Sequence, residues 1–192
     1  DVELILNTKP IKADPYNLNL QLETTYNGLQ TAKNEGYKHL LKTRTDQRLH
    51  RHDIFDYFMN ICKVFPLNSI DKQESRLIVT SFGTIKYRLY GITDFMMFGA
   101  TNDMLNYWGT DKYEIGIREF FDESTENGIP IKNGVPIIAE IYLCIKYLKF
   151  LGIEPDWTIN QYWTFVRDYF CVINGMDLDI YWNKYQKLRE YQ

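Results

Sequence analysis

The chain has 192 residues, of which 45% are hydrophobic and 24% are charged, so it is long and apolar enough to fold around its own core. A net charge of −3 argues against a nucleic-acid-binding protein, which needs a positively charged surface for phosphates. The three cysteines lie in apolar surroundings and form neither a disulfide framework nor a zinc-site pattern, which favours a reducing compartment. We expect one domain over residues 1–192, either complete or a piece of a longer chain.

The first half of the chain alternates between extended and helical patterns. In order, we predict a strand over Val2–Leu6, a helix from Leu18 to Gly36, a strand over His39–Thr43, a helix over Ile54–Val64 capped by Asp53, and a strand over Leu77–Thr80. A strand, a helix and a second strand in succession indicate a unit with parallel pairing.

The second half is richer in helical patterns. We predict an apolar strand that begins at Asp94, a helix from its cap Thr101 to Trp108, an amphipathic segment over Tyr113–Glu123, and helices over Gly134–Gly152, Thr158–Val172 and Asp177–Gln192. The expected fold class is therefore α/β, with an open, mostly parallel mixed sheet flanked by helices and a helical C-terminal portion.

A polar cluster follows the strand that ends at Thr43. It consists of Arg44, Thr45, Asp46, Gln47 and Arg48. Ligands of open α/β sheets bind beyond the carboxyl ends of the strands. A carboxylate there can hold a divalent metal, and guanidinium groups can bind phosphate oxygens. The alternative is a surface ion pair at a strand end.

Two segments resemble a known family. Leu40–Leu49 is similar to the "VLKxRSDxxL" stretch of WavE-type lipopolysaccharide-synthesis proteins, and Tyr90–Trp108 is similar to their "FHxSDWFxFGxxxDLxxLW" stretch. Asn19–Ala32 and Ala139–Tyr142 resemble two further elements of that family, in the same order. The resemblance implies a GT-A-like glycosyltransferase that uses a nucleotide-sugar, linked to UDP, GDP or dTDP, and a glycan or glycolipid acceptor.

The same resemblance suggests roles for individual residues. Glu140 is expected to act as the base, with Asp94 binding sugar hydroxyls as the competing catalytic residue. Asp46 is expected to bind Mn²⁺ or Mg²⁺ as a single carboxylate, because Arg44 stands where an Asp-x-Asp pair has its first acid. The donor is expected to contact Asn19, Gln21, Arg44, Thr45, Asp46 and Arg48.

Structural alternatives stay open for several of these residues. Asp94 is also explained as a cap or as the ion-pair partner of Arg88, Glu140 as a first-turn helix residue, and Asn19 as a helix cap. The rival function is a non-catalytic carbohydrate- or partner-binding domain. The expected location is the cytoplasm, with the cytoplasmic face of a membrane, reached by peripheral association, as the alternative.

Overall fold

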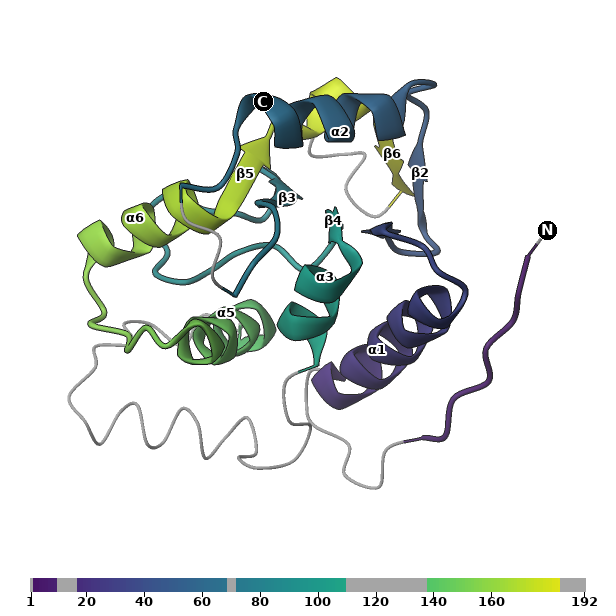
Figure 1. Cartoon of the computed structure of the whole chain (residues 1–192), viewed down its shortest axis with the longest axis horizontal. Helices are drawn as coiled ribbons and strands as arrows, with labels where there is room; N and C mark the ends of the chain where they lie inside the picture. Colours follow the sequence, from purple (N-terminus) through teal and green to yellow (C-terminus); the bar gives the residue numbers. More distant parts are fainter. Residues whose placement is uncertain (1, 10–16, 69–71, 110–137, 184–192) are drawn as a thin grey trace.

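The computed structural model describes residues 2–9, 17–68, 72–109 and 138–183. Its centre is a four-stranded mixed sheet with the strand order β1-β4-β3-β5, and a separate two-stranded sheet pairs β2 with β6 (Figure 1). The strands are β1 (His39–Lys42), β2 (Gln47–Leu49), β3 (Leu77–Thr80), β4 (Met97–Ala100), β5 (Phe170–Ile173) and β6 (Ile180–Trp182). The helices are α1 (Leu18–Asn34), α2 (Ile54–Val64), α3 (Thr101–Trp108), α5 (Ile138–Leu151), α6 (Ile159–Tyr169) and the 3₁₀ helix η1 (Gly175–Leu178).

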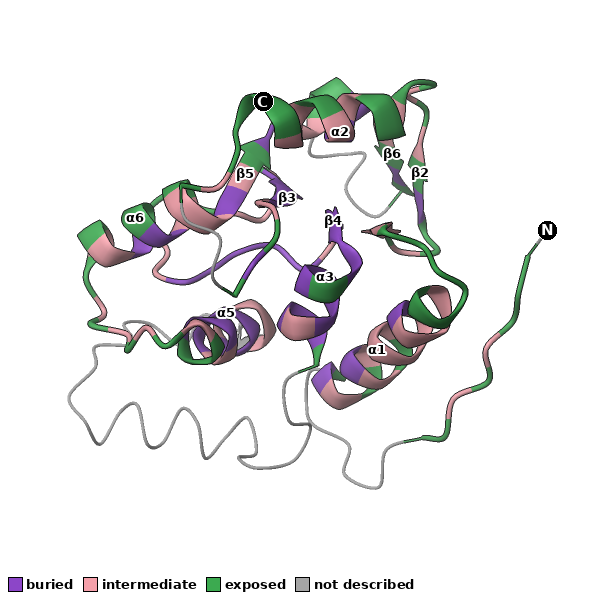
Figure 2. Ribbon diagram, in the orientation of Figure 1, coloured by how far each residue is buried: buried purple, intermediate pink, exposed green. Residues whose placement is uncertain are grey.

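Helices cover both faces of the central sheet, because alternate strand residues point to opposite sides. Leu77, Val79 and Met97 belong to a large core shared with α1, α3, α5 and α6. Ile78 and Phe98 belong to a smaller core shared with Phe58 of α2. The buried stripes of the helices accordingly face the sheet in Figure 2, and the outer faces are exposed.

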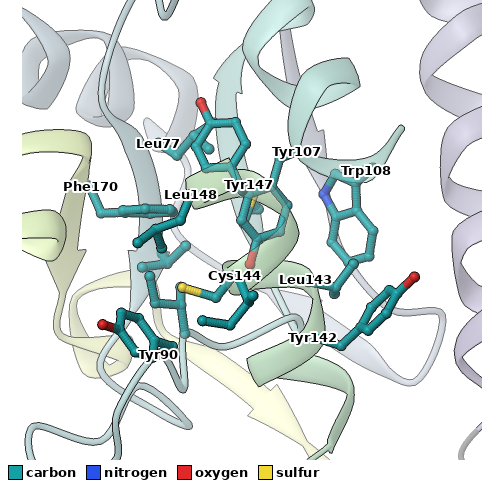
Figure 3. Packing of buried hydrophobic residues seen from close by; sticks show 14 of the residues in the cluster. Leu77, Tyr90, Tyr107, Trp108, Tyr142, Leu143, Cys144, Tyr147, Leu148 and Phe170 are labelled. Atoms are coloured by element: carbon teal, nitrogen blue, oxygen red, sulfur yellow. The ribbon is translucent and has the colours of Figure 1, made fainter. Parts of the chain in front are cut away.

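Aromatic side chains dominate the larger core. Tyr107 of α3 and Tyr147 of α5 lie edge to face with ring centroids 5.1 Å apart, and both are fully buried (Figure 3). The Tyr147 hydroxyl donates a hydrogen bond to Gln73, whose amide group donates to the Tyr169 carbonyl. Geometrically specific contacts of this kind fix how α3, α5 and the start of β5 pack together.

The strand directions bring several chain segments to one edge of the sheet. β4 is antiparallel to both β1 and β3, and β5 is parallel to β3. The carboxyl ends of β1, β3 and β5 therefore share an edge with the amino end of β4. We call this edge the carboxyl edge.

Most of the predicted elements are confirmed, and the α/β class is confirmed as a mixed sheet with helices. The expectation of mostly parallel pairing is wrong, because two of the three pairings in the central sheet are antiparallel. Val2–Leu6 forms no strand, and most of its apolar side chains are exposed: Val2 is 98% exposed and Leu4 is 81% exposed. β1 accordingly pairs with β4 and not with this segment.

The C-terminal portion differs more from the prediction. Thr158 caps α6 as expected, but the helix ends at Tyr169 and the next four residues form β5. Phe170–Ile173 is rich in residues that favour strands, and pairing with β3 decides the outcome. The prediction of a helix from Asp177 is also wrong as far as residue 183, because η1 and β6 lie in this segment instead. Residues 184–192 and the Tyr113–Glu123 segment lie outside the described residues.

Two expected capping residues form other contacts. Asp53 precedes α2, but its carboxylate pairs with the Arg51 guanidinium, with the Arg51 Nε and Asp53 Oδ1 atoms 2.7 Å apart. Thr101 is the first residue of α3, and its hydroxyl donates to the Tyr37 carbonyl. Both side chains therefore tie their helices to the preceding chain.

No helix within the described ranges is long and apolar enough to span a membrane.

Asp103 is buried in the first turn of α3 and connects it to the loop before β3. Its two carboxylate oxygens accept hydrogen bonds from the backbone N–H groups of Glu74 and Ser75, both at 2.9 Å. We expect Asp103→Ala to lower the free energy of unfolding by about 2 kcal/mol, because both N–H groups lose a partly buried partner. Asp103→Asn keeps one acceptor oxygen and should lose less. Urea denaturation measures both; a loss below about 0.5 kcal/mol for Asp103→Ala would contradict this role.

Candidate active site

The carboxyl edge gathers residues that lie far apart in the sequence. Lys42 ends β1, and Asp94 lies three residues before β4. α1 carries Gln21 and α5 carries Glu140, and both helices pack on the face of the sheet that holds the larger core. Two of these residues, Asp94 and Glu140, are the predicted catalytic pair.

Asp94 is the centre of a buried polar group. Its Oδ2 accepts a hydrogen bond of 2.6 Å from the Gln21 side-chain amide, and its backbone carbonyl accepts one from the Lys42 ammonium group. The Lys42 ammonium also lies over the Trp108 ring, 4.8 Å from the centroid. We refer to Gln21, Lys42, Asp94, Trp108 and Glu140 as the Asp94 cluster.

Several polar atoms of this region are buried without a hydrogen-bond partner in the described part of the chain. They are Asp94 Oδ1, Trp108 Nε1 and the neighbouring Tyr107 hydroxyl. Asp94 itself is only 6% exposed, and it forms no ion pair with Arg88, whose guanidinium donates to the carbonyl groups of Gly83 and Gly91. Polar atoms that are buried without a partner in a folded interior are costly.

Glu140 lies in the first turn of α5, where it is half-buried. Burial, and to a smaller extent the negative charge of Asp94, together raise the pKa of its carboxyl group from the ordinary 4.5 to about 7. Burial lowers the pKa of Lys42 to about 8, although the charge of Asp94 opposes that shift. A carboxyl group with a pKa near neutrality is well suited to accept a proton at physiological pH.

Asp46 follows the carboxyl end of β1 and has a more exposed environment than Asp94. Its Oδ1 lies 2.9 Å from Arg44 Nε, and its Oδ2 accepts hydrogen bonds from Arg44 Nη2 at 3.3 Å and from Trp182 Nε1 at 3.0 Å. These hydrogen bonds, with that from Arg44 the stronger, lower the pKa of Asp46 to about 2. Its side chain is 43% exposed, so the ion-pair alternative is the arrangement that the structure contains.

The neighbours of Asp46 are also engaged. Arg48 donates from Nη1 to the backbone carbonyl groups of Thr45 and Gln47, both at 2.8 Å. On α1, Asn19 is the second helical residue, so it is not the cap, a position that Asn17 occupies. Gln21, predicted to contact the donor together with Arg44, Asp46 and Arg48, is instead bound to Asp94 in the structure. Arg44, Asp46 and Arg48 form a second group at the end of β1.

The residues around Asp46 do not fit a metal ion. Both carboxylate oxygens already accept hydrogen bonds, from Arg44 and from Trp182. Within the described ranges, no group of three or more His, Cys, Asp or Glu side chains is placed to hold a metal. Binding of Mn²⁺ or Mg²⁺ at Asp46 therefore stays a prediction from the resemblance.

A pocket of about 360 Å³ opens beside the Asp46 group. It lies at the carboxyl ends of the parallel strands β3 and β5, and Phe82, Phe95 and Trp182 form its aromatic wall, with the Phe95 and Trp182 ring centroids 4.7 Å apart. We call it the aromatic pocket. Its other described lining residues are Gln47, Thr80, Ser81, Gly83, Ile85, Met96, Asn174, Gly175, Met176 and Ile180.

Sequence reasoning missed this pocket. Trp182 reaches it because β6 pairs with β2 and sets Trp182 opposite Gln47. No local pattern in the sequence indicates that pairing, and the segment that contains Trp182 reads as a helix. The only indication of the pocket in the sequence is that Phe82 and Phe95 lie close to the ends of two predicted strands.

The model of the WavE lipopolysaccharide synthesis family matches residues 6–161, which is most of the chain. The chain belongs to the WavE lipopolysaccharide synthesis family. Family membership confirms the resemblance seen in the motifs and associates the chain with lipopolysaccharide synthesis. Comparison with curated proteins and with solved structures gives no match. The Asp94 cluster and Asp46 lie inside the range matched to the WavE family, whereas Trp182 lies beyond it.

Proposed function

We propose that this WavE-family chain is a glycosyltransferase that moves a sugar from a nucleotide-diphosphate donor to a lipopolysaccharide-type acceptor. The observation that carries the proposal is the Asp94 cluster, in which two carboxyl groups meet at the carboxyl edge of the sheet. One of them has a buried oxygen without a described partner, and the other has a pKa of about 7. A carboxyl group whose pKa is raised by burial and by a neighbouring charge, as that of Glu140 is, is typical of active sites.

The chemistry assigns a role to each carboxyl group. Asp94 Oδ1 accepts a hydrogen bond from a sugar hydroxyl, while Gln21 holds the opposite oxygen in place. Glu140 takes the proton of the attacking acceptor hydroxyl as that oxygen bonds to the anomeric carbon and the bond from this carbon to the nucleoside diphosphate breaks. A single displacement of this kind inverts the configuration at the anomeric carbon.

Cationic side chains at the end of β1 suit the departing diphosphate. Lys42, Arg44 and Arg48 lie within seven residues of one another in the sequence, at the edge that holds Asp94. Guanidinium groups bind phosphate oxygens in a bidentate manner and remain charged at any physiological pH. No step of this proposal requires a metal ion.

The proposal is tested by binding and turnover together. Thermal shift of the purified chain with UDP-, GDP-, dTDP- and CMP-linked sugars, with and without Mn²⁺, should identify one donor class that stabilises the folded state. The same donor with lipopolysaccharide oligosaccharides should give a glycosylated product, and NMR should show its anomeric configuration to be inverted. Donor binding without any transfer to these acceptors would contradict the proposal.

The rival function, a binding domain without catalysis, has one specific observation in its favour. Both oxygens of Asp46 are held by Arg44 and Trp182, so the position that the resemblance assigns to the donor is closed by internal contacts. This rival predicts glycan binding with no release of nucleoside diphosphate under any condition. Measuring nucleotide release separates the two functions.

A further inference from the structure

The aromatic pocket is lined by uncharged residues. Among its described lining residues no Asp, Glu, Lys, Arg or His occurs, although charged side chains are abundant at the adjacent end of β1. Its polar groups are the neutral side chains of Gln47, Thr80, Ser81 and Asn174. A phosphate would lose its hydration here without gaining a cation, so the lining disfavours an anionic ligand.

The wall of the pocket is made of flat rings. Phe82 and Phe95 both meet the Trp182 indole edge to face, with ring centroids 5.7 and 4.7 Å away. Rigid aromatic faces beside neutral hydrogen-bonding groups suit a ligand that is apolar on one side and hydroxylated at its rim. A neutral sugar ring has this character, and a volume of about 360 Å³ is large enough to hold one.

Asp46 and Arg44 hold the indole from outside the pocket. Asp46 Oδ2 accepts the hydrogen bond of Trp182 Nε1 at 3.0 Å, and the Arg44 guanidinium lies over the indole ring, 5.4 Å from its centroid. Arg44 and Asp46 are also bound to each other. The three side chains form a closed triangle across the β2–β6 pairing, which sets Trp182 opposite Gln47.

We propose that the aromatic pocket binds a neutral sugar ring of the acceptor glycan and that Asp46, braced by Arg44, is a positioning residue that fixes Trp182 as the wall of this pocket. The identification of this sugar as part of the acceptor rests on the proposed function, whereas sugar binding itself is measurable without turnover. It assigns Asp46 a role that needs no metal ion, in keeping with its two occupied oxygens. Phe95 and Met96, which line the pocket, directly follow Asp94 in the sequence.

The test is a titration of the intact chain with a panel of neutral methyl glycosides and disaccharides, without any donor, in EDTA and again in Mn²⁺. Intrinsic tryptophan fluorescence and calorimetry report binding. We expect saturable binding of at least one sugar with the same affinity in EDTA and in Mn²⁺. Trp182→Ala should weaken it at least tenfold and Asp46→Ala about fivefold to tenfold. Asp46→Asn, which keeps an acceptor oxygen for the indole N–H, should stay within about threefold of the unchanged chain.

Trp163→Ala is the matched control, because Trp163 lies exposed on α6 and does not line the pocket. Trp182→Phe keeps a ring but removes the N–H that binds Asp46, so it should also weaken binding, and it covers the case in which Trp182→Ala fails to fold. Unchanged affinity in a folded Trp182 variant, or no binding by any sugar of the panel, would overturn the inference. If affinity fell equally in Asp46→Asn, in Asp46→Ala and in the unchanged chain with EDTA, Asp46 would be a metal ligand and the positioning role would be overturned. Donor-dependent nucleotide release, assayed separately, tells such a failure from a failure of the proposed function.

Discussion

Glu140→Gln is expected to reduce glycosyl transfer by about 10²- to 10⁴-fold, the range that a general base supplies. Glutamine has nearly the same shape as glutamic acid, but it cannot accept a proton. The loss should therefore fall on kcat, while donor binding in a thermal-shift assay stays unchanged. Initial rates under saturating donor measure the effect.

The same residue predicts the pH dependence of the reaction. A base must be deprotonated, and the pKa of Glu140 is about 7, so the transfer rate should rise as the pH increases from 6 to 8. Glu140→Gln should abolish this limb of the pH profile.

Stability should change in the direction opposite to activity. The folded state raises the pKa of Glu140 from 4.5 to about 7, so the folded chain holds this proton more tightly than the unfolded chain does. The resulting stability is fully present below about pH 4.5 and is lost as the pH rises through about 7, at a cost of at most about 3 kcal/mol. Glutamine, which stays neutral, should therefore make the protein more stable than the unchanged chain at pH 8, and the difference should vanish near pH 4.

Glu154→Gln is the matched control for both measurements, because Glu154 is exposed and lies three residues after the end of α5 at Leu151. It should change neither the transfer rate nor the unfolding curve. A Glu140→Gln protein that keeps its transfer rate would show that another group is the base. A variant without added stability at pH 8 would show that Glu140 is not desolvated in the folded chain.

The second large effect is expected at Asp94. Asp94→Asn should lower kcat/KM by about 10- to 100-fold, because a neutral amide is a weaker acceptor for a sugar hydroxyl than a carboxylate is. The substitution also removes the negative charge that raises the pKa of Glu140. The rising limb of the pH profile should therefore move to lower pH in the remaining activity.

This shift separates the coupled pair from a purely structural role. If Asp94 only held Gln21 and Lys42 in place, Asp94→Asn would lower the rate without moving the pH profile. Asp56→Asn is the control, since Asp56 is an exposed acid in the first turn of α2. Measured pH profiles of the three proteins decide between the two roles.

Local pattern accounts for much of the observed fold. α2 has the predicted bounds, Ile54–Val64, and β3 has the predicted bounds, Leu77–Thr80. The spacing of apolar residues predicts the helix, and the β-propensity of its residues predicts the strand. The same holds for Gly36, which ends the α1 region with a positive φ of 87°. Asp94 and Glu140 were also recognisable in the sequence as candidate catalytic residues, and the structure brings them close enough for the charge of Asp94 to raise the pKa of Glu140.

The failures share a physical cause. Val2–Leu6 has the apolar composition of a strand but no strand partner in the described chain. Phe170–Val172 was predicted as the end of a helix, but Phe170–Ile173 pairs with β3. Strand pairing is a long-range contact, so propensity within a segment cannot decide it. The direction of β4, and with it the mixed character of the sheet, depends on the same contacts.

The sequence by itself determined the family, the helices of the first half and the acids that carry the proposed chemistry, because each of these depends on residue type and short-range spacing. Only the tertiary structure decided what those acids do. Burial beside Asp94 moves the pKa of Glu140 to about 7, and a bond from Trp182, 136 residues away in the chain, turns Asp46 toward an indole ring. Burial and long-range pairing are properties of the folded chain, and they distinguish two carboxyl groups that look alike in the sequence.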